Sequence, residues 1–286
     1  MHLRDRILDL IFATSSKSTF NSADQSCSEP IDVPAAVGQT IQALKKEAAI
    51  TDEGVNYEWI RNSDAYTRLQ SVLYPCLASF DLYTLETIDD KKAFWINLYN
   101  LLTIDAVLHF SVQQSVTEGW LGIIRFFRKA AYVVGGLRFS LEDIEHGILR
   151  GNRGLMYFPG KQFSSNDARY PHVMQNLDAR VHFALNCASR SCPPIAFYAP
   201  DRLDAQLDLA AANFIDGETQ LDKSGVVLHI SRIFKWYRSD FGGTFGVLEW
   251  IQRYLPENDI RRQLIDHFEE KTMTIVKKYD WHLNGL

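Results

Sequence analysis

The sequence predicts a helix-rich α+β protein that folds as a single domain with a small antiparallel sheet. Several long segments have apolar residues at helical spacing, whereas only a few short segments have the pattern of paired strands. The chain has 286 residues, of which 46% are hydrophobic and 23% are charged, so it can bury a sizeable core. The pattern also shows no internal repeat and no second domain boundary.

Residues 1–32 are predicted to be a flexible segment, and residues 33–286 a single globular domain. Residues 14–32 are rich in serine and nearly free of periodic apolar side chains. The apolar stretch at residues 7–13 is short and contains Asp9, which argues against a secretory signal. We therefore expect the folded core to begin near residue 33.

Charge and composition restrict the classes of partner. The formal net charge is −5, and no run of Lys or Arg suggests a surface for nucleic acid. No apolar run approaches the ~20 residues that a membrane helix needs, so no membrane partner is expected. Four scattered cysteines do not suggest a disulfide framework, which favours a reducing compartment and a cytoplasmic location. No cofactor is expected, and the partner is an unknown substrate or protein.

The first half of the predicted domain is mainly helical. Residues 35–49 and 64–80 have helical spacing and are expected to pack on the core. Residues 91–110 form the most helix-like segment, preceded by two aspartates that suit the positive end of a helix dipole. Its broad apolar surface is interrupted by Asn97 and Asn100. These amides either tie down neighbouring loops or orient a catalytic group or ligand.

A hairpin and a further helix follow. Residues 132–139 contain two apolar segments around a Gly-Gly turn, which is typical of a β-hairpin. Ser140 then provides a helix cap, so that Glu145 and His146 fall in the first two turns. Such a Glu-His pair is either a solvated helix edge or part of a site. Residues 151–171, rich in Gly, Asn, Ser and Pro, are expected to form a surface loop.

The segment 178–194 carries the residues best suited to chemistry. Apolar residues alternate with His182, Ala184 and Asn186, which predicts an extended strand. The composition then becomes small and polar, so Cys187 is expected at a tight loop or the start of a helix that two prolines terminate.

The remaining elements alternate between helices and short strands. Residues 201–213, 233–237 and 245–254 have helical spacing, residues 220–230 have the pattern of a hairpin, and residues 272–276 are expected to form a last strand.

Five motifs together resemble a known family. They lie at residues 92–100, 143–150, 178–194, 234–241 and 279–284. In this order they resemble the domain-of-unknown-function family 547, DUF547, over residues from about 65 to 286. The resemblance implies no settled activity. It does imply that members occur alone or joined to glutaredoxin-like, signalling-type or coiled-coil segments.

A nucleophilic cysteine requires a thiolate, and hence an imidazole or a helix N-terminus close by. In a strand, His182 and Cys187 would lie on opposite faces about 16 Å apart, and in a helix they would differ by about 140°. Only a sharp turn would join them. Otherwise His146 is the preferred base because it matches the family motif, followed by His229 and His282, and His182 would orient the site.

These observations predict a cysteine-dependent hydrolase or acyl transferase acting on an amide, ester or thioester. The predicted catalytic residues are Cys187, His182, His146, Glu145 and Asn97. The predicted substrate-binding residues, which include donors for an oxyanion or acidic group, are Asn100, Asn186, Ser189, Arg190, Ser191, Tyr237 and Asp240.

The architecture suggests an analogy with papain and transglutaminase enzymes, in which a Cys at a helix start meets a His on a strand. Their order of Cys before His is met here only by His229 or His282. Three alternatives stay open: a non-catalytic interaction or scaffold domain, a Cys187–Cys192 disulfide acting as a thiol redox module, and a zinc site at His182, Cys187 and Cys192. The zinc site lacks the usual short Cys spacing and a fourth ligand, so no metal is expected.

Overall fold

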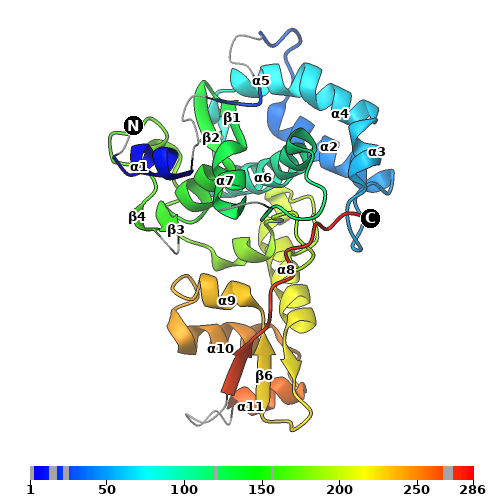
Figure 1. Cartoon of the computed structure of the whole chain (residues 1–286), viewed down its shortest axis with the longest axis vertical. Helices are drawn as coiled ribbons and strands as arrows, with labels where there is room; N and C mark the ends of the chain where they lie inside the picture. The colour runs from blue at the N-terminus through cyan, green and yellow to red at the C-terminus, as the bar shows by residue number, and fades with distance from the viewer. Residues whose placement is uncertain (1–2, 13–17, 22–25, 119–121, 156–157, 267–272) are drawn as a thin grey trace. The chain divides into compact units, whose positions relative to one another are not determined.

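The computed structural model describes residues 3–12, 18–21, 26–118, 122–155, 158–266 and 273–286. Helices make up about 52% of the structure, which confirms the helix-rich α+β class (Figure 1). The chain groups into two compact units. Unit 1 contains Met1–Asp178, Leu185–Leu203 and Trp281–Leu286, and unit 2 contains Ala179–Ala184 and Asp204–Asp280. A single globular domain over residues 33–286 stays a prediction.

Unit 1 is built from helices that follow one another along the chain. They are α1 (Leu3–Phe12), α2 (Val33–Lys46), α3 (Tyr57–Arg61), α4 (Asp64–Arg68), α5 (Tyr74–Ala78), α6 (Ile88–Phe110) and α7 (Gly122–Lys129). A short π-helix, Leu69–Leu73, joins α4 to α5, so the predicted helix at residues 64–80 is continuous but not uniform.

Helix α6 is the core of unit 1. It begins with a capping box, in which the Asp90 backbone N–H donates to Thr87 Oγ1 (3.0 Å) and the Thr87 backbone N–H donates to Asp90 Oδ2 (3.0 Å). Every residue from 93 to 108 is buried. The helix ends where Ser111 adopts a left-handed backbone, with φ of 51°. The predicted central helix at residues 91–110 is therefore confirmed.

Two hairpins lie in unit 1. Strands β1 (Ala131–Val134) and β2 (Leu137–Ser140) pair antiparallel around Gly135 and Gly136, as the Gly-Gly turn predicts. Both glycines have positive φ, 59° and 73°, which a residue with a Cβ adopts only with strain. Strands β3 (Arg153–Leu155) and β4 (Phe158–Lys161) form a second hairpin inside the stretch predicted to be a loop.

Unit 2 holds the rest of the helices and a three-stranded sheet. The helices are α8 (Leu203–Glu218), whose first residue belongs to unit 1, α9 (Arg232–Trp236), α10 (Gly243–Tyr254) and α11 (Ile260–Asp266). The sheet contains β5 (Gln220–Leu221), β6 (Val227–Ile230) and β7 (Met273–Val276). Strands β5 and β6 form the predicted hairpin, but β6 and β7 run parallel. The part of the chain that the structure describes thus contains three small sheets, one of them mixed, where a single antiparallel sheet was predicted.

One local prediction is wrong. The segment predicted as a strand before Cys187 forms a short 3-10 helix at Ala179–Phe183, and the residues after it do not start a helix. The helix predicted after Ser140 is present, with the Asp143 backbone N–H donating to Ser140 Oγ (3.1 Å), but its turns at Asp143–Leu149 are π-helical. In residues 178–194, therefore, Cys187 does not lie at a helix start and His182 does not lie on a strand, as the analogy with papain and transglutaminase would require; His229 does lie on β6.

The described residues of the N-terminal segment contact the rest of unit 1. The Val133 backbone N–H donates to Asn21 Oδ1 (2.6 Å), and Asn21 Nδ2 donates to the Val133 carbonyl (2.9 Å). Cys27 forms a disulfide with Cys76 of α5. Flexibility of residues 1–32 stays a prediction, and residues 13–17 and 22–25 lie outside the described residues. Cys27 nevertheless has a structural partner that the sequence did not indicate.

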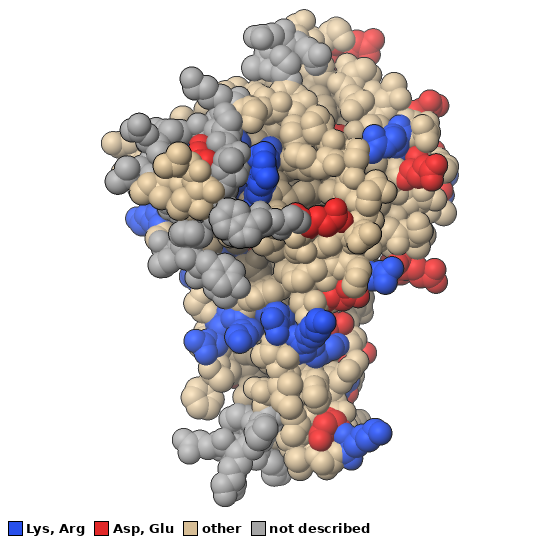
Figure 2. Space-filling view, viewed as in Figure 1, with Lys and Arg blue, Asp and Glu red and all other residues tan. Residues whose placement is uncertain are grey.

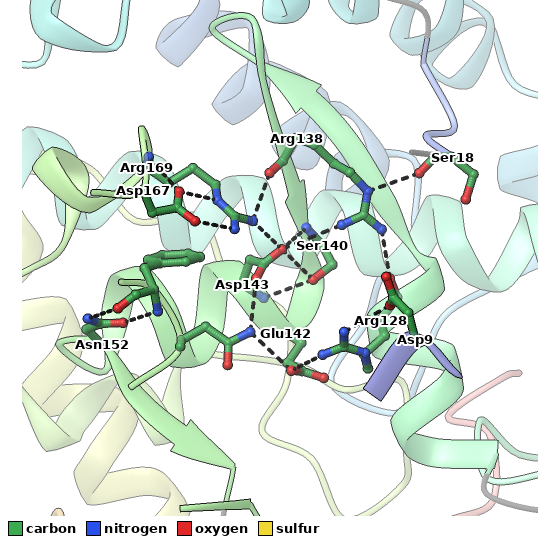
Figure 3. Close-up of polar contacts among 12 residues, drawn as sticks. Asp9, Ser18, Arg128, Arg138, Ser140, Glu142, Asp143, Asn152, Asp167 and Arg169 are labelled. Carbon is green, nitrogen blue, oxygen red and sulfur yellow. Dashed lines mark hydrogen bonds and ion pairs between the residues drawn. The ribbon is translucent and has the colours of Figure 1, made fainter. Parts of the chain in front are cut away.

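Charged residues on the visible face lie in local groups among uncharged ones (Figure 2). Another set is buried inside unit 1 (Figure 3). Asp143, 5% exposed, accepts hydrogen bonds from Ser140 Oγ (2.8 Å), Gln162 Nε2 (2.9 Å) and Arg169 Nη1 (3.0 Å). Glu142, 2% exposed, pairs with Arg128 Nη1 at 2.9 Å. Buried charges need such partners because their desolvation is costly.

Candidate functional site

The predicted nucleophile belongs to a disulfide. Cys187 is bonded to Cys192, and Cys27 to Cys76, so all four cysteines of the chain are paired. The expectation that the cysteines form no disulfide framework is therefore wrong, and the Cys187–Cys192 disulfide that the sequence left open as an alternative is present. Cys187 and Cys192 are both partly exposed. A role for Cys187 as a nucleophile stays a prediction, and it applies to the reduced protein.

Asn186 holds the loop that contains this disulfide. Its backbone N–H donates to Asn100 Oδ1 in α6 (2.9 Å). Its side-chain Nδ2 donates to the Pro193 carbonyl (2.6 Å), and its Oδ1 accepts from the Ala188 backbone N–H (2.8 Å) and Asn284 Nδ2 (3.3 Å). The side chain thus links the residue after Cys187 to the residue after Cys192.

Residues 281–286 run beside the same loop. The Arg190 backbone N–H donates to the His282 carbonyl (2.9 Å), and the Asn284 backbone N–H donates to the Ala188 carbonyl (3.1 Å). Tyr57 Oη donates to Asn284 Oδ1 (2.7 Å), and burial raises the pKa of Tyr57 well above its ordinary value. The tyrosine therefore remains a neutral donor. The C-terminal end lies next to α3 (Figure 1). Its contacts with Ala188 and Arg190 help to hold the disulfide loop in place.

Two donors face the sulfur atoms. The Cys187 backbone N–H lies 2.9 Å from Cys192 Sγ. Ser189 Oγ, in a residue that is 1% exposed, lies 3.3 Å from Cys187 Sγ and 3.5 Å from Cys192 Sγ. Hydrogen bonds to a thiolate favour its charged form. Of the two sulfurs, Cys192 Sγ receives the shorter contact and the backbone donor.

The amides of α6 hold backbone. Asn97 Nδ2 donates to the Tyr198 carbonyl (2.7 Å), and the Tyr198 backbone N–H donates to Asn97 Oδ1 (2.9 Å). Asn100 Oδ1 accepts from Asn186 as described above. These contacts match the first alternative for the two residues, in which they tie down neighbouring segments. A catalytic role for Asn97 and a substrate-binding role for Asn100 stay predictions.

Glu145 and His146 lie on the π-helix, a type of element that often occurs at functional sites. Tyr99 Oη of α6 donates to Glu145 Oε2 (3.0 Å). His146 Nδ1 lies 2.6 Å from Arg150 Nη1. Because a guanidinium only donates, Nδ1 is the acceptor, and a neutral His146 carries its proton on Nε2. His146 is 6% exposed, so it is not the solvated helix edge that the sequence also allowed.

His182 lies in unit 2 with two other predicted site residues. Its Nε2 is 2.9 Å from Asp240 Oδ2, and the two side chains are 2% and 0% exposed. The ring of Tyr237 stacks on the imidazole, with centroids 3.9 Å apart. Asp240 and Tyr237 were predicted to bind substrate, and both contact His182. Cys187 belongs to unit 1, so the two groups are described separately.

Some residues of the disulfide site were not selected from the sequence. Asn284 is one of them, and the signal for it in the sequence is its position at the end of the family-like motif at residues 279–284. Cys192 was considered only for the redox and zinc alternatives. Among the described residues, no three His, Cys, Asp or Glu side chains are arranged to hold a metal ion. The described helices include none that is long and apolar enough to span a bilayer.

Comparison with known proteins identifies one relationship. The search found no match among curated proteins and none among solved structures. A family model described as "Protein of unknown function, DUF547" matches the chain at residues 84–215. This range contains α6, the π-helix and the disulfide loop, and is shorter than the predicted range of 65–286. Over residues 84–215, this chain is therefore similar to the DUF547 family of unknown function.

Proposed function

We propose that this protein is a thiol–disulfide redox module whose reversible couple is Cys187 and Cys192. The observation that carries the proposal is a partly exposed disulfide in a short loop, whose sulfur atoms accept contacts from a backbone N–H and a buried hydroxyl. A purely structural disulfide needs no donors aimed at its sulfurs, whereas a reversible one gains from them because they stabilise the thiolate that leaves.

The exchange step follows from these contacts. A thiolate of a partner dithiol attacks Cys187 Sγ, the sulfur–sulfur bond breaks, and its electron pair leaves on Cys192 Sγ. The Cys187 N–H, 2.9 Å from Cys192 Sγ, and Ser189 stabilise that thiolate. The second partner thiolate attacks the partner's sulfur in the mixed disulfide, which releases Cys187 and oxidises the partner. The partner loses two electrons and two protons, and Cys187 and Cys192 gain them.

The predicted hydrolase or acyl transferase would require the reduced form, with Cys187 as nucleophile. The buried His182–Asp240 pair favours this second candidate, because a carboxylate orients an imidazole in many acid–base sites. The two candidates differ in one measurable property. A hydrolase thiol stays reduced during turnover, whereas a redox couple cycles. An interaction or scaffold domain would show neither reactivity.

The cysteine pairing also bears on location. The sequence favours the cytoplasm, but disulfides persist mainly in oxidising compartments. We therefore propose an oxidising compartment in place of the cytoplasmic one. The partner proposed here is a protein dithiol or disulfide, or a small thiol.

Titration of the full chain in glutathione buffers, followed by alkylation and peptide mass analysis, tests the redox proposal. We expect Cys187 and Cys192 to become reduced together at a potential above about −300 mV, the range of labile couples. Cys27 and Cys76 should remain bonded under the same conditions. A Cys187–Cys192 bond that persists below that potential is structural, and the redox proposal then fails.

Ser189→Ala tests the role of the hydroxyl. Reduction by dithiothreitol should slow by about tenfold, because a lost hydrogen bond to a developing charge is worth about 1.4 kcal/mol or more. Ser71→Ala is the matched control, since Ser71 is exposed and its hydroxyl donates to the Thr67 carbonyl four residues earlier. Equal rates in the two variants would contradict the assigned role of Ser189.

A further inference from the structure

Asn186 contacts both arms of the redox loop with one buried side chain. It is 3% exposed. Its Oδ1 accepts from the residue after Cys187, and its Nδ2 donates to the residue after Cys192, at 2.8 and 2.6 Å. A single amide thus spans the two positions whose separation decides whether the sulfurs can meet.

The amide is fixed from two further directions. Its own backbone N–H donates to Asn100 of α6, the most buried helix of unit 1. Its Oδ1 also accepts from Asn284, which Tyr57 holds from the other side. This clamp, formed by the contacts of Asn186 with both arms, is therefore anchored by Asn100 in the core and by Asn284 as well as by the sulfur–sulfur bond.

The loop backbone also needs this support. Ala188 has φ of +64°, a left-handed conformation that residues with a Cβ adopt only at a cost. Its N–H donates to Asn186 Oδ1, and its carbonyl accepts from the Asn284 backbone. The Asn186 amide therefore contributes to holding this costly conformation next to Cys187.

We infer that Asn186 is a positioning residue that holds Cys187 and Cys192 close in the dithiol state and so sets the reduction potential of the couple. This inference rests on the proposed redox function. A preorganised dithiol closes to the disulfide with a higher equilibrium constant, because less conformational freedom is lost at closure. Asn186 therefore lowers the reduction potential. Substrate binding, the role predicted from the sequence, is not required.

Asn186→Ala provides the test. The equilibrium constant for closing the disulfide, measured in glutathione buffers with the full chain, should fall by at least tenfold. A tenfold change corresponds to a rise of about 30 mV in the two-electron potential. Asn152→Ala is the matched control. Asn152 is also a buried amide, 6% exposed, and it forms a two-way pair with the Phe163 backbone (Figure 3). In the Asn152→Ala variant, the reduction potential of the Cys187–Cys192 couple should equal that of the wild type.

The outcomes separate the inference from the function on which it rests. If Asn186→Ala does not fold, Asn186→Asp keeps the acceptor for Ala188 and loses the donation to Pro193, and the same rise in potential is expected from it. Equal potentials in the Asn186 variant and the Asn152 variant would overturn the positioning role while a reversible couple in the wild type still supported the function. A wild-type couple that never opens reversibly would overturn both.

Discussion

Replacing Asp143 with asparagine should lower the free energy of unfolding by about 1–3 kcal/mol, the cost of leaving buried hydrogen-bond donors unsatisfied. The carboxylate is 5% exposed and lies 3.0 Å from Arg169 Nη1. Asparagine keeps the shape of the side chain but places an NH₂ group against the donors of Ser140 or Arg169. The variant therefore removes one of the carboxylates that Arg169 contacts, leaving Asp167 in place, and sets donor against donor.

The effect should also depend on pH. Burial by itself raises the pKa of Asp143, but the charges of Arg169 and Arg138 and hydrogen bonds from Gln162 and Ser140 hold that pKa below its ordinary value. A lowered pKa in the folded state adds stability that is present above the unfolded pKa of about 3.9. This stability is lost as the pH falls through the lower, folded-state pKa. The difference between wild type and variant should shrink in that range.

Urea denaturation followed by tryptophan fluorescence, at pH 7 and at several values below pH 4, measures both effects. Asp52→Asn is the control, because Asp52 is exposed and its replacement should change stability by less than about 0.5 kcal/mol. A loss at pH 7 below about 1 kcal/mol for Asp143→Asn would refute the reasoning. So would a loss that does not diminish in acid.

Three further predictions concern the rest of the chain. Cys27→Ser should cost about 4 kcal/mol in denaturant unfolding of the oxidised protein, since the bond to Cys76 closes a chain separation of 49 residues; no loss would mean that the bond does not form. Tyr132→Phe should cost about 1–3 kcal/mol because its hydroxyl donates to buried Asp105 at 2.7 Å, whereas Tyr83→Phe, at a side chain 72% exposed, should leave stability unchanged. Limited proteolysis should trim the N-terminal segment and leave one stable core. Early cleavage near residue 150 into two stable halves would contradict the single domain.

Elements whose signals are local could be predicted. The central helix has its cap and its apolar surface within one stretch of sequence, and the hairpin at Ala131–Ser140 has glycines at the two positions that require positive φ. The strand predicted before Cys187 is wrong because its alternating apolar and polar residues do not alternate between buried and exposed positions. His182 is 4% exposed in spite of its polarity, since Asp240 pairs with it inside unit 2. Asp240 lies 58 residues from His182 in the sequence, so the local pattern around His182 does not indicate this pairing.

The candidate site depends on even longer-range contacts. The sequence selected Asn186, Cys187 and Ser189 because polar residues interrupt an apolar pattern. It could not indicate that Asn284 completes the clamp, or that Cys27 finds Cys76, because each pairing depends on how the chain folds back. The π-helix was missed for another reason: a pattern over so few residues fits a period of 3.6 about as well as the wider π turn.

The position of Asn284 imposes an order on biosynthesis. It leaves the ribosome about 100 residues after Asn186, which at about 5–20 residues per second corresponds to a delay on the order of 5–20 s. During that interval the loop with Cys187 and Cys192 lacks its contact with Asn284, and both of its thiols can react with an oxidant. Cys27 and Cys76 have both emerged before Cys187 is translated, so they can pair with each other before Cys187 and Cys192 are present. Sequential emergence thereby protects the nascent chain from mispairing.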